Sequence, residues 1–193
     1  MDEVSYWFNP RFLQVTVLID AQQLFARNSP QSIQLQNMLH PARIVEIRKE
    51  LEKVKWRENV KYDQYQYKVA VMPLTLKRFF ASPAVKKMLS VITGLQIKKI
   101  KGEWCVFGPG DYTVMQDKIV AQKGVFFELD FTDFWQQAWG GYTSFVDKEE
   151  KLRVLPGWNQ LTLVKEAKNM QHFVKYVNHR AKNKRMMVRG IVL

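Results

Sequence analysis

The pattern of apolar residues changes near residue 95, and this change constrains the fold more than any other feature of the sequence. Before it, apolar residues recur mainly at helical spacing; after it, the chain breaks into short apolar or alternating runs such as EWCVF, GVFFELDF and QLTLV. Glycine, proline or asparagine separates these runs, as at Gly108, Gly140 and Asn159. Many short strands spaced in this way are typical of an antiparallel sandwich or barrel. We therefore predict an α+β protein with helices first and a barrel-like β core after them.

The length of 193 residues, 47% of them hydrophobic, is enough for one substantial core and leaves little for a second. We predict a single domain over residues 1–193, mainly helical in 1–94 and built of strands in 95–193. No run approaches twenty apolar residues, and the start MDEVSYWFNP does not have the order of a signal peptide. These features favour a soluble protein of the cytoplasm or nucleus without membrane contact. The single cysteine, Cys105, excludes an internal disulfide and a cysteine-rich zinc site.

Proline, asparagine and glycine mark the ends of the predicted helices. Asn9 and Pro10 suit a helix start, Pro41 opens a second, amphipathic helix, and Gly94 suits a left-handed end after residues 83–93. The run SIQLQNML alternates and predicts a short strand, whereas residues 56–70 have no clear period. The state of that last segment stays open.

The net charge of +12 favours polyanionic partners, because neutralising phosphates releases condensed counterions. Basic residues concentrate near the C-terminus, and two interpretations stay open for them: a solvated face, or a surface for nucleic acid or another acidic partner. The residues predicted for such contacts are Lys165, Lys168, Lys175, Arg180, Lys182, Lys184 and Arg189.

Other chemistry-bearing patterns are weak. The sequence has no phosphate-binding loop of the G-x-x-x-x-G-K-[ST] type, no G-x-G-x-x-G turn and no H-E-x-x-H motif. Glu128, Asp130 and Asp133 alternate with apolar residues. General acid-base chemistry would need such carboxyls, but the alternation favours the solvated face of a strand.

Several segments resemble one known family. GDYTVMQDK, GGYTSFV with LRVLPGWNQLTLV, and HFVKYVNHRAKNKRMMVRG are similar to landmarks of iron and 2-oxoglutarate dependent oxygenases of the prolyl hydroxylase type. WFNPRFL and SPAVKKMLSVITGL extend the resemblance to the C-terminal, oxygenase-like domain of the ribosomal-protein prolyl hydroxylases. The resemblance implies a double-stranded β-helix, or jelly-roll, core with the N-terminal helices packed on one sheet.

The same resemblance implies a degenerate site. The family holds iron with a His-x-Asp pair and a distal histidine, and binds 2-oxoglutarate with an arginine or lysine; the pair falls on Gln116 and Lys118, the distal histidine on His172 and the cosubstrate residue on Arg185. A lysine ammonium about 4 Å from a dication repels it by roughly 8 kcal/mol at an effective dielectric constant near 20. We therefore expect no catalytic residues, no bound metal and no cofactor.

These observations predict a non-catalytic protein-binding or scaffold module linked to the translation apparatus or to ribosomal-protein hydroxylation. Its partner would be a ribosomal protein, a catalytic oxygenase domain, or a second copy in a homodimer. One alternative is an active prolyl hydroxylase with Fe(II) at His172, Asp117 and Asp111 and 2-oxoglutarate at Arg185. Another is an RNA or ribosome-surface binder whose C-terminal cations act with stacking by Trp104, Trp158 or Tyr176.

Overall fold

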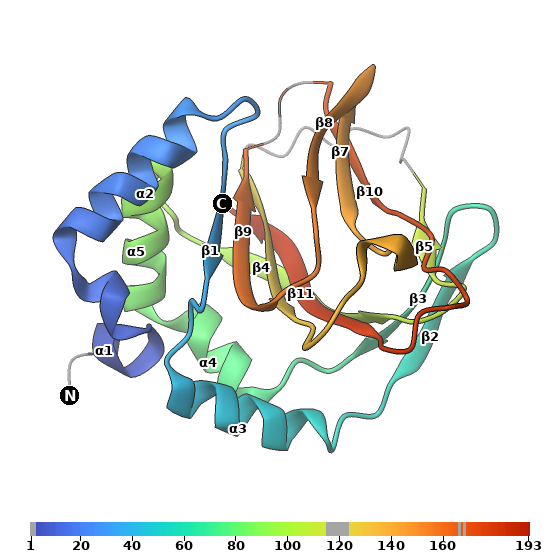
Figure 1. Ribbon diagram of the computed structural model, residues 1–193. Coiled ribbons are helices and arrows are strands. Elements are labelled where there is room, and N and C mark those ends of the chain that lie inside the picture. Colours follow the sequence, from blue (N-terminus) through green and yellow to red (C-terminus); the bar gives the residue numbers. More distant parts are fainter. Residues whose placement is uncertain (1–2, 115–123, 166, 168) are drawn as a thin grey trace.

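Two antiparallel sheets lie against each other, and helices cover the outer face of the larger sheet (Figure 1). The computed structural model describes residues 3–114, 124–165, 167 and 169–193. Its helices are α1 (Glu3–Trp7), η1 (Pro10–Leu13), α2 (Val15–Arg27), α3 (Pro41–Leu51), α4 (Leu74–Ala81), α5 (Pro83–Thr93) and η2 (Gln137–Trp139). Its strands are β1 (Ser32–Gln36), β2 (Arg57–Lys61), β3 (Tyr65–Ala70), β4 (Ile100–Phe107), β5 (Tyr112–Thr113), β6 (Val125–Phe131), β7 (Thr143–Asp147), β8 (Glu149–Val154), β9 (Trp158–Val164), β10 (Gln171–Val174) and β11 (Arg185–Val192).

The strand order is that of a jelly roll. The large sheet has the order β1-β9-β6-β11-β4-β3-β2, with β5 paired to β3, and the small sheet has the order β10-β7-β8. Every recorded strand pair is antiparallel. The predicted α+β class, the jelly-roll core and the packing of N-terminal helices on one sheet are confirmed. Among the helices within the described ranges, none is long and apolar enough to cross a membrane.

Local capping explains why the helices begin and end where they do. The Nδ1 atom of His40 accepts a hydrogen bond from the Ala42 amide at 3.2 Å, and Pro41 occupies the first turn of α3. The Ser82 hydroxyl oxygen accepts a hydrogen bond from the Val85 amide at 3.3 Å at the start of α5. Gly94 ends α5 in the left-handed conformation, with φ of 70°. The helix starts and the glycine end predicted from the sequence are thus present.

The segment without a clear period forms the hairpin of β2 and β3, which extends the large sheet beyond β4. The first 94 residues therefore contribute three strands as well as the helical layer, which corrects the simple division into helices first and strands later. The physical reason is exposure: in β2 four of five residues are exposed, so no buried face imposes an alternating sequence.

Two layers of core lie on the two faces of the large sheet. One packs the helices against residues such as Phe127, Leu129 and Val188, and the other fills the space between the sheets with residues such as Phe126, Phe145 and Val174. All seven residues of β6 are buried, because both faces of this central strand are covered. The space between the two sheets is called the roll interior below.

Candidate functional site

A buried ion cluster occupies the roll interior. Arg185, the first residue of β11, has a side chain with 0% exposure. Its Nε atom donates a hydrogen bond to Oδ2 of Asp130 at 2.8 Å, and its Nη2 atom donates to Oε2 of Glu128 at 2.8 Å. Both acids lie on β6, two residues apart, so they point to the same face of the sheet.

The small sheet completes this cluster. The Nη1 atom of Arg185 donates to the Gly141 carbonyl oxygen at 2.8 Å and to Oγ1 of Thr143 at 2.9 Å. The Thr143 hydroxyl in turn donates to Oε1 of Glu128 at 2.5 Å. Every nitrogen of the guanidinium group therefore donates to an atom of this chain. Arg185, Glu128, Asp130 and Thr143 are called the Arg185 cluster below.

The Arg185 cluster holds two carboxyl groups for one guanidinium group. Burial raises the pKa of Asp130 above its ordinary value, while Arg185 and the hydrogen bond from Thr132 act in the opposite direction. With both carboxyls ionised the cluster holds one excess negative charge, and protonation of Asp130 would remove it. Two carboxyls and one guanidinium can remain buried because each oxygen or nitrogen is close to an opposite charge or a hydrogen-bond partner.

This cluster corrects one expectation and brings together residues that the sequence did not connect. Glu128 and Asp130 were expected on a solvated face, yet each is only 1% exposed, because both faces of β6 are covered. Asp133 beyond the strand is exposed and forms an ion pair with Arg48 at 2.5 Å. Complementary charge is the one feature of the sequence that points to this pairing. Two acids interrupt the apolar run VFFELDF, and two arginines interrupt the run RMMVRGIV.

A second arginine lies nearly buried on the same strand. Arg189 donates from Nε to Oε1 of Glu103 at 2.9 Å, and its guanidinium carbon lies 4.6 Å from the ring centroid of Tyr67. Its side chain is 13% exposed, so the predicted contact of Arg189 with an outside polyanion is corrected. Burial raises the pKa of the neighbouring thiol of Cys105 to about 12 and that of Tyr67 to about 12.

His172 faces the roll interior from β10. Its ring centroid lies 4.3 Å from that of Phe126 and 5.4 Å from that of Phe145. His172 and the Arg185 cluster therefore border the same face of β6, where Phe126, Glu128 and Asp130 alternate. Within the described parts of the chain, no three His, Cys, Asp or Glu side chains are grouped so that they could hold a metal ion.

Some of the remaining predicted site residues lie within the described part of the chain, and others do not. Gln116, Asp117, Lys118 and Lys168 lie outside the described residues. Asp111 is 4% exposed and closes the tight turn before β5, where its Oδ2 atom accepts a hydrogen bond from the Gly108 amide at 2.8 Å. Burial raises the pKa of Asp111.

The residues predicted for contact with a polyanion differ in exposure. Five of its cations are exposed, namely Lys165, Lys175, Arg180, Lys182 and Lys184. Of the three predicted stacking residues, Tyr176 is 43% exposed, whereas Trp104 is 1% exposed and is stacked on Trp56. Trp158 is half-buried, and the guanidinium of Arg48 lies 4.2 Å from its ring centroid. Trp104 is therefore not available for stacking on a base at the surface.

A family model described as oxoglutarate and iron-dependent oxygenase degradation C-term matches residues 60–191 of the chain. Among curated proteins, prolyl 3-hydroxylase OGFOD1 of Xenopus laevis is 40% identical over 55 residues, which are 27% of this chain and 11% of that protein. Its Mus musculus counterpart is 34% identical over 89 residues, 42% of this chain and 16% of that protein. The chain thus matches only a small part of the length of these relatives.

Solved structures extend the likeness over most of the chain. A prolyl hydroxylase of Trichoplax adhaerens, in complex with a hypoxia inducible factor oxygen degradation domain peptide fragment, has a TM-score of 0.68, is 13% identical and covers 93% of both chains. A Pseudomonas putida prolyl-4-hydroxylase has a TM-score of 0.66 and 14% identity, covering 91% of this chain and 97% of that chain. At such identities the likeness establishes the fold alone.

Proposed function

We propose a function from the premise that this chain belongs to the family described as oxoglutarate and iron-dependent oxygenase degradation C-term. The proposal is a non-catalytic, protein-binding module with the oxygenase fold, acting in ribosomal-protein hydroxylation or elsewhere in the translation apparatus. Its place of action would be the cytoplasm or the nucleus.

The Arg185 cluster carries this proposal. A residue that binds the far carboxylate of 2-oxoglutarate needs guanidinium donors that face an open space. Here the Nε and Nη2 atoms of Arg185 each donate to a carboxylate of the chain itself, and the Nη1 atom donates to Gly141 and Thr143. A dicarboxylate entering this place would meet two fixed negative groups and displace bonds already made. The Arg185 cluster therefore does not fit the cosubstrate.

The metal-ligand positions support the same proposal at the level of sequence. The positions that resemble the His-x-Asp pair hold Gln116 and Lys118, which offer a neutral amide and a cationic amine to a dication. Thiolate, imidazole and carboxylate groups are the usual protein ligands of transition metals. The donor set at these positions does not fit iron.

The relatives suggest what such a module would work with. The curated proteins that it matches are named prolyl 3-hydroxylases, and this chain matches a small part of each. We therefore propose that it binds a catalytic oxygenase domain or the ribosomal protein that is hydroxylated. Affinity purification from the native cell tests this partner class: enrichment of either supports it, and enrichment of neither contradicts it.

A cosubstrate titration tests the non-catalytic part of the proposal. The whole chain is mixed with Fe(II) and 2-oxoglutarate without oxygen, and binding is followed by calorimetry and by the absorbance of the metal-cosubstrate charge transfer. We expect neither heat of binding nor absorbance. Tight binding of both compounds, or turnover of 2-oxoglutarate to succinate by the unmodified chain, would overturn the proposal.

A double variant separates the effect of the metal-ligand positions from the effect of the Arg185 cluster. Gln116→His with Lys118→Asp restores the imidazole and the carboxylate while the Arg185 cluster stays intact. We expect this double variant to gain measurable affinity for Fe(II), and still to bind no 2-oxoglutarate because the donors of Arg185 remain engaged. Cosubstrate binding by the variant would show that the Arg185 cluster opens readily.

A further inference from the structure

The large sheet has an open edge beside β4. β11 pairs with β4 along its whole length, from Ile100 to Phe107, whereas β3 pairs with it only at Trp104, Cys105 and Val106. After Ala70 the chain leaves the sheet and enters α4. Within the described residues, Ile100–Glu103 therefore have a strand partner on one side only.

The backbone of this edge is directed outward. Lys99 and Leu193 exchange both backbone hydrogen bonds, at 2.9 and 2.8 Å. Bonded and non-bonded pairs alternate in an antiparallel ladder, so Lys101 and Glu103 also direct their amides and carbonyls toward β11. Ile100 and Gly102 then direct theirs to the open side, where Gly102 is exposed. The edge offers two donors and two acceptors at the spacing of one strand.

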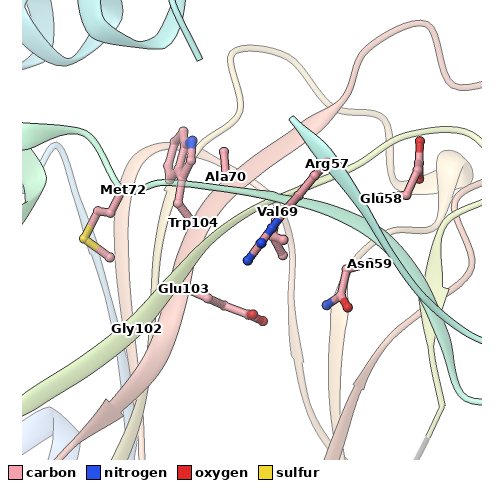
Figure 2. A pocket seen from close by; sticks show the side chains of 9 residues that line it. All are labelled: Arg57, Glu58, Asn59, Val69, Ala70, Met72, Gly102, Glu103 and Trp104. Carbon is pink, nitrogen blue, oxygen red and sulfur yellow. The ribbon is translucent and has the colours of Figure 1, made fainter. Parts of the chain in front are cut away.

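Two adjoining cavities lie along this edge and share Met72 and Gly102. The first, of about 490 Å³, is bordered by β2 residues such as Arg57 and by Trp104 (Figure 2). The Trp104 side chain is 1% exposed, and no atom of the described residues accepts a hydrogen bond from its indole Nε1. Its indole ring packs against Trp56 and Phe131 in the core.

The second cavity, of about 540 Å³, combines positive charge with an apolar floor. Met72, Phe80, Ala81 and Ile100 provide the apolar surface, and the charged lining residues are Lys77, Lys86, Lys99 and Lys101. Its lining contains no acidic residue to balance these lysines. An anionic group that enters this cavity would therefore be attracted, and an apolar group beside it would be removed from water.

We propose that the groove formed by the open edge Ile100–Glu103 and these two cavities binds an extended acidic segment of a partner protein as an added strand. The partner backbone pairs with Ile100 and Gly102. Ile100 packs toward the core beneath the helices, so the alternation of side chains directs Lys99 and Lys101 to the opposite face of the sheet. Acidic residues on that face of the added strand can meet Lys99 and Lys101, while apolar residues on its other face meet Met72 and Phe80. The inference deepens the proposed protein-binding function and rests on it.

The positive charge of the second cavity selects this occupant over two others. A second copy of the chain would bring another set of lysines to the same edge, and edge lysines are a known device against such pairing. RNA bound in the groove would need exposed rings for stacking, but Phe80 is 9% exposed and Trp104 is 1% exposed. An acidic peptide satisfies the charge, the apolar floor and the open backbone together.

The test uses a fluorescent peptide of about eight residues in which glutamate and valine alternate, a length within the usual range of a strand. Its binding to the whole chain is followed by fluorescence anisotropy, and hydrogen exchange of the Ile100 and Gly102 amides is followed by NMR. We expect saturable binding and slower exchange at both amides. A copy methylated on alternate backbone nitrogens keeps its charges and should bind at least about tenfold more weakly, because it cannot complete the ladder.

Matched charge reversals locate the site. Lys99→Glu with Lys101→Glu should weaken peptide binding by roughly tenfold, whereas Lys49→Glu with Lys53→Glu, the same change of charge at exposed residues that line neither cavity, should leave it within about twofold. Equal losses in both variants, unchanged exchange at Ile100 and Gly102, or preferential binding of a uridine oligonucleotide in the groove would overturn the inference. Those outcomes would leave the result of the cosubstrate titration unaffected, so the two proposals can fail separately.

Discussion

At the scale of single residues, the neighbours of Arg185 determine what its charge can do. The guanidinium lies at the start of a central strand, at the position that resembles the cosubstrate residue of the oxygenases, but its counter-charges are Glu128 and Asp130 of the same chain. A buried ion group of this kind is stable only while its members remain together, since a lone buried charge is costly. The Arg185 cluster is therefore both an obstacle to an outside carboxylate and a link between the two sheets.

Removing only the positive charge of the Arg185 cluster should strongly destabilise the fold. We predict that Arg185→Met lowers the free energy of unfolding by about 3–5 kcal/mol, because it leaves two buried carboxyls without their positive partner. Urea unfolding of the variant and of the unmodified chain, followed by circular dichroism at neutral pH, measures this difference.

The control for this prediction removes all charges together. Adding Glu128→Gln and Asp130→Asn to Arg185→Met leaves polar but uncharged side chains, and should recover most of the lost stability. If the triple variant were no more stable than the single one, the packing of the arginine stem would matter more than its charge.

At the scale of secondary structure, the sequence predicted the elements that carry strong local signals. The helices that begin at Pro10, Pro41 and Pro83 and the end at Gly94 follow from capping chemistry, and the strand at residues 32–36 follows from alternation. The hairpin of β2 and β3 could not be predicted, because an exposed edge strand such as β2 has no buried face to constrain its side chains. The Arg185 cluster was missed because β6 is covered on both faces. Its acids alternate with apolar residues as they would on a half-exposed strand, so the sequence pattern does not reveal that they are buried.

The close approach of β4 and β11 depends on glycine. A Cβ atom added at Gly190 would lie 1.9 Å from the Lys101 carbonyl oxygen and 2.6 Å from Cα of Gly102, both of them backbone atoms. We predict that Gly190→Ala lowers the free energy of unfolding by about 3 kcal/mol, because the two strands must separate to make room. Thermal or urea unfolding measures the loss.

Gly94→Ala provides the matched comparison. Gly94 has a φ of 70°, but nothing lies within 4 Å of its added Cβ, so this change should cost only about 1 kcal/mol from backbone conformation. Equal losses for the two variants would show that the sheet relaxes around residue 190 without cost.

At the scale of the whole molecule, helices and sheets are joined by a continuous core. Residues of α2, α4 and α5 pack in one buried cluster with residues of β6, β9 and β11. The N-terminal segment is also held by Asn159, which accepts a hydrogen bond from the Leu39 amide at 2.8 Å and donates one to the Leu39 carbonyl at 3.0 Å. The helical part and the β core therefore share one buried cluster.

This shared core predicts a single unfolding event. Circular dichroism, which reports on helices and strands, and tryptophan fluorescence should give the same midpoint, and the calorimetric and van't Hoff enthalpies should agree. Two separated transitions would instead indicate that the segment before residue 95 unfolds independently of the strands that follow it.

The position of β11 determines when the large sheet can be completed during folding. The strand of the large sheet that comes last in sequence lies between β6 and β4, at the middle of that sheet. During synthesis the two halves of the sheet must therefore wait, with their inner edges unprotected, until residue 192 has left the ribosome. Such late, long-range pairing slows folding and keeps apolar surface and unpaired strand edges exposed for longer.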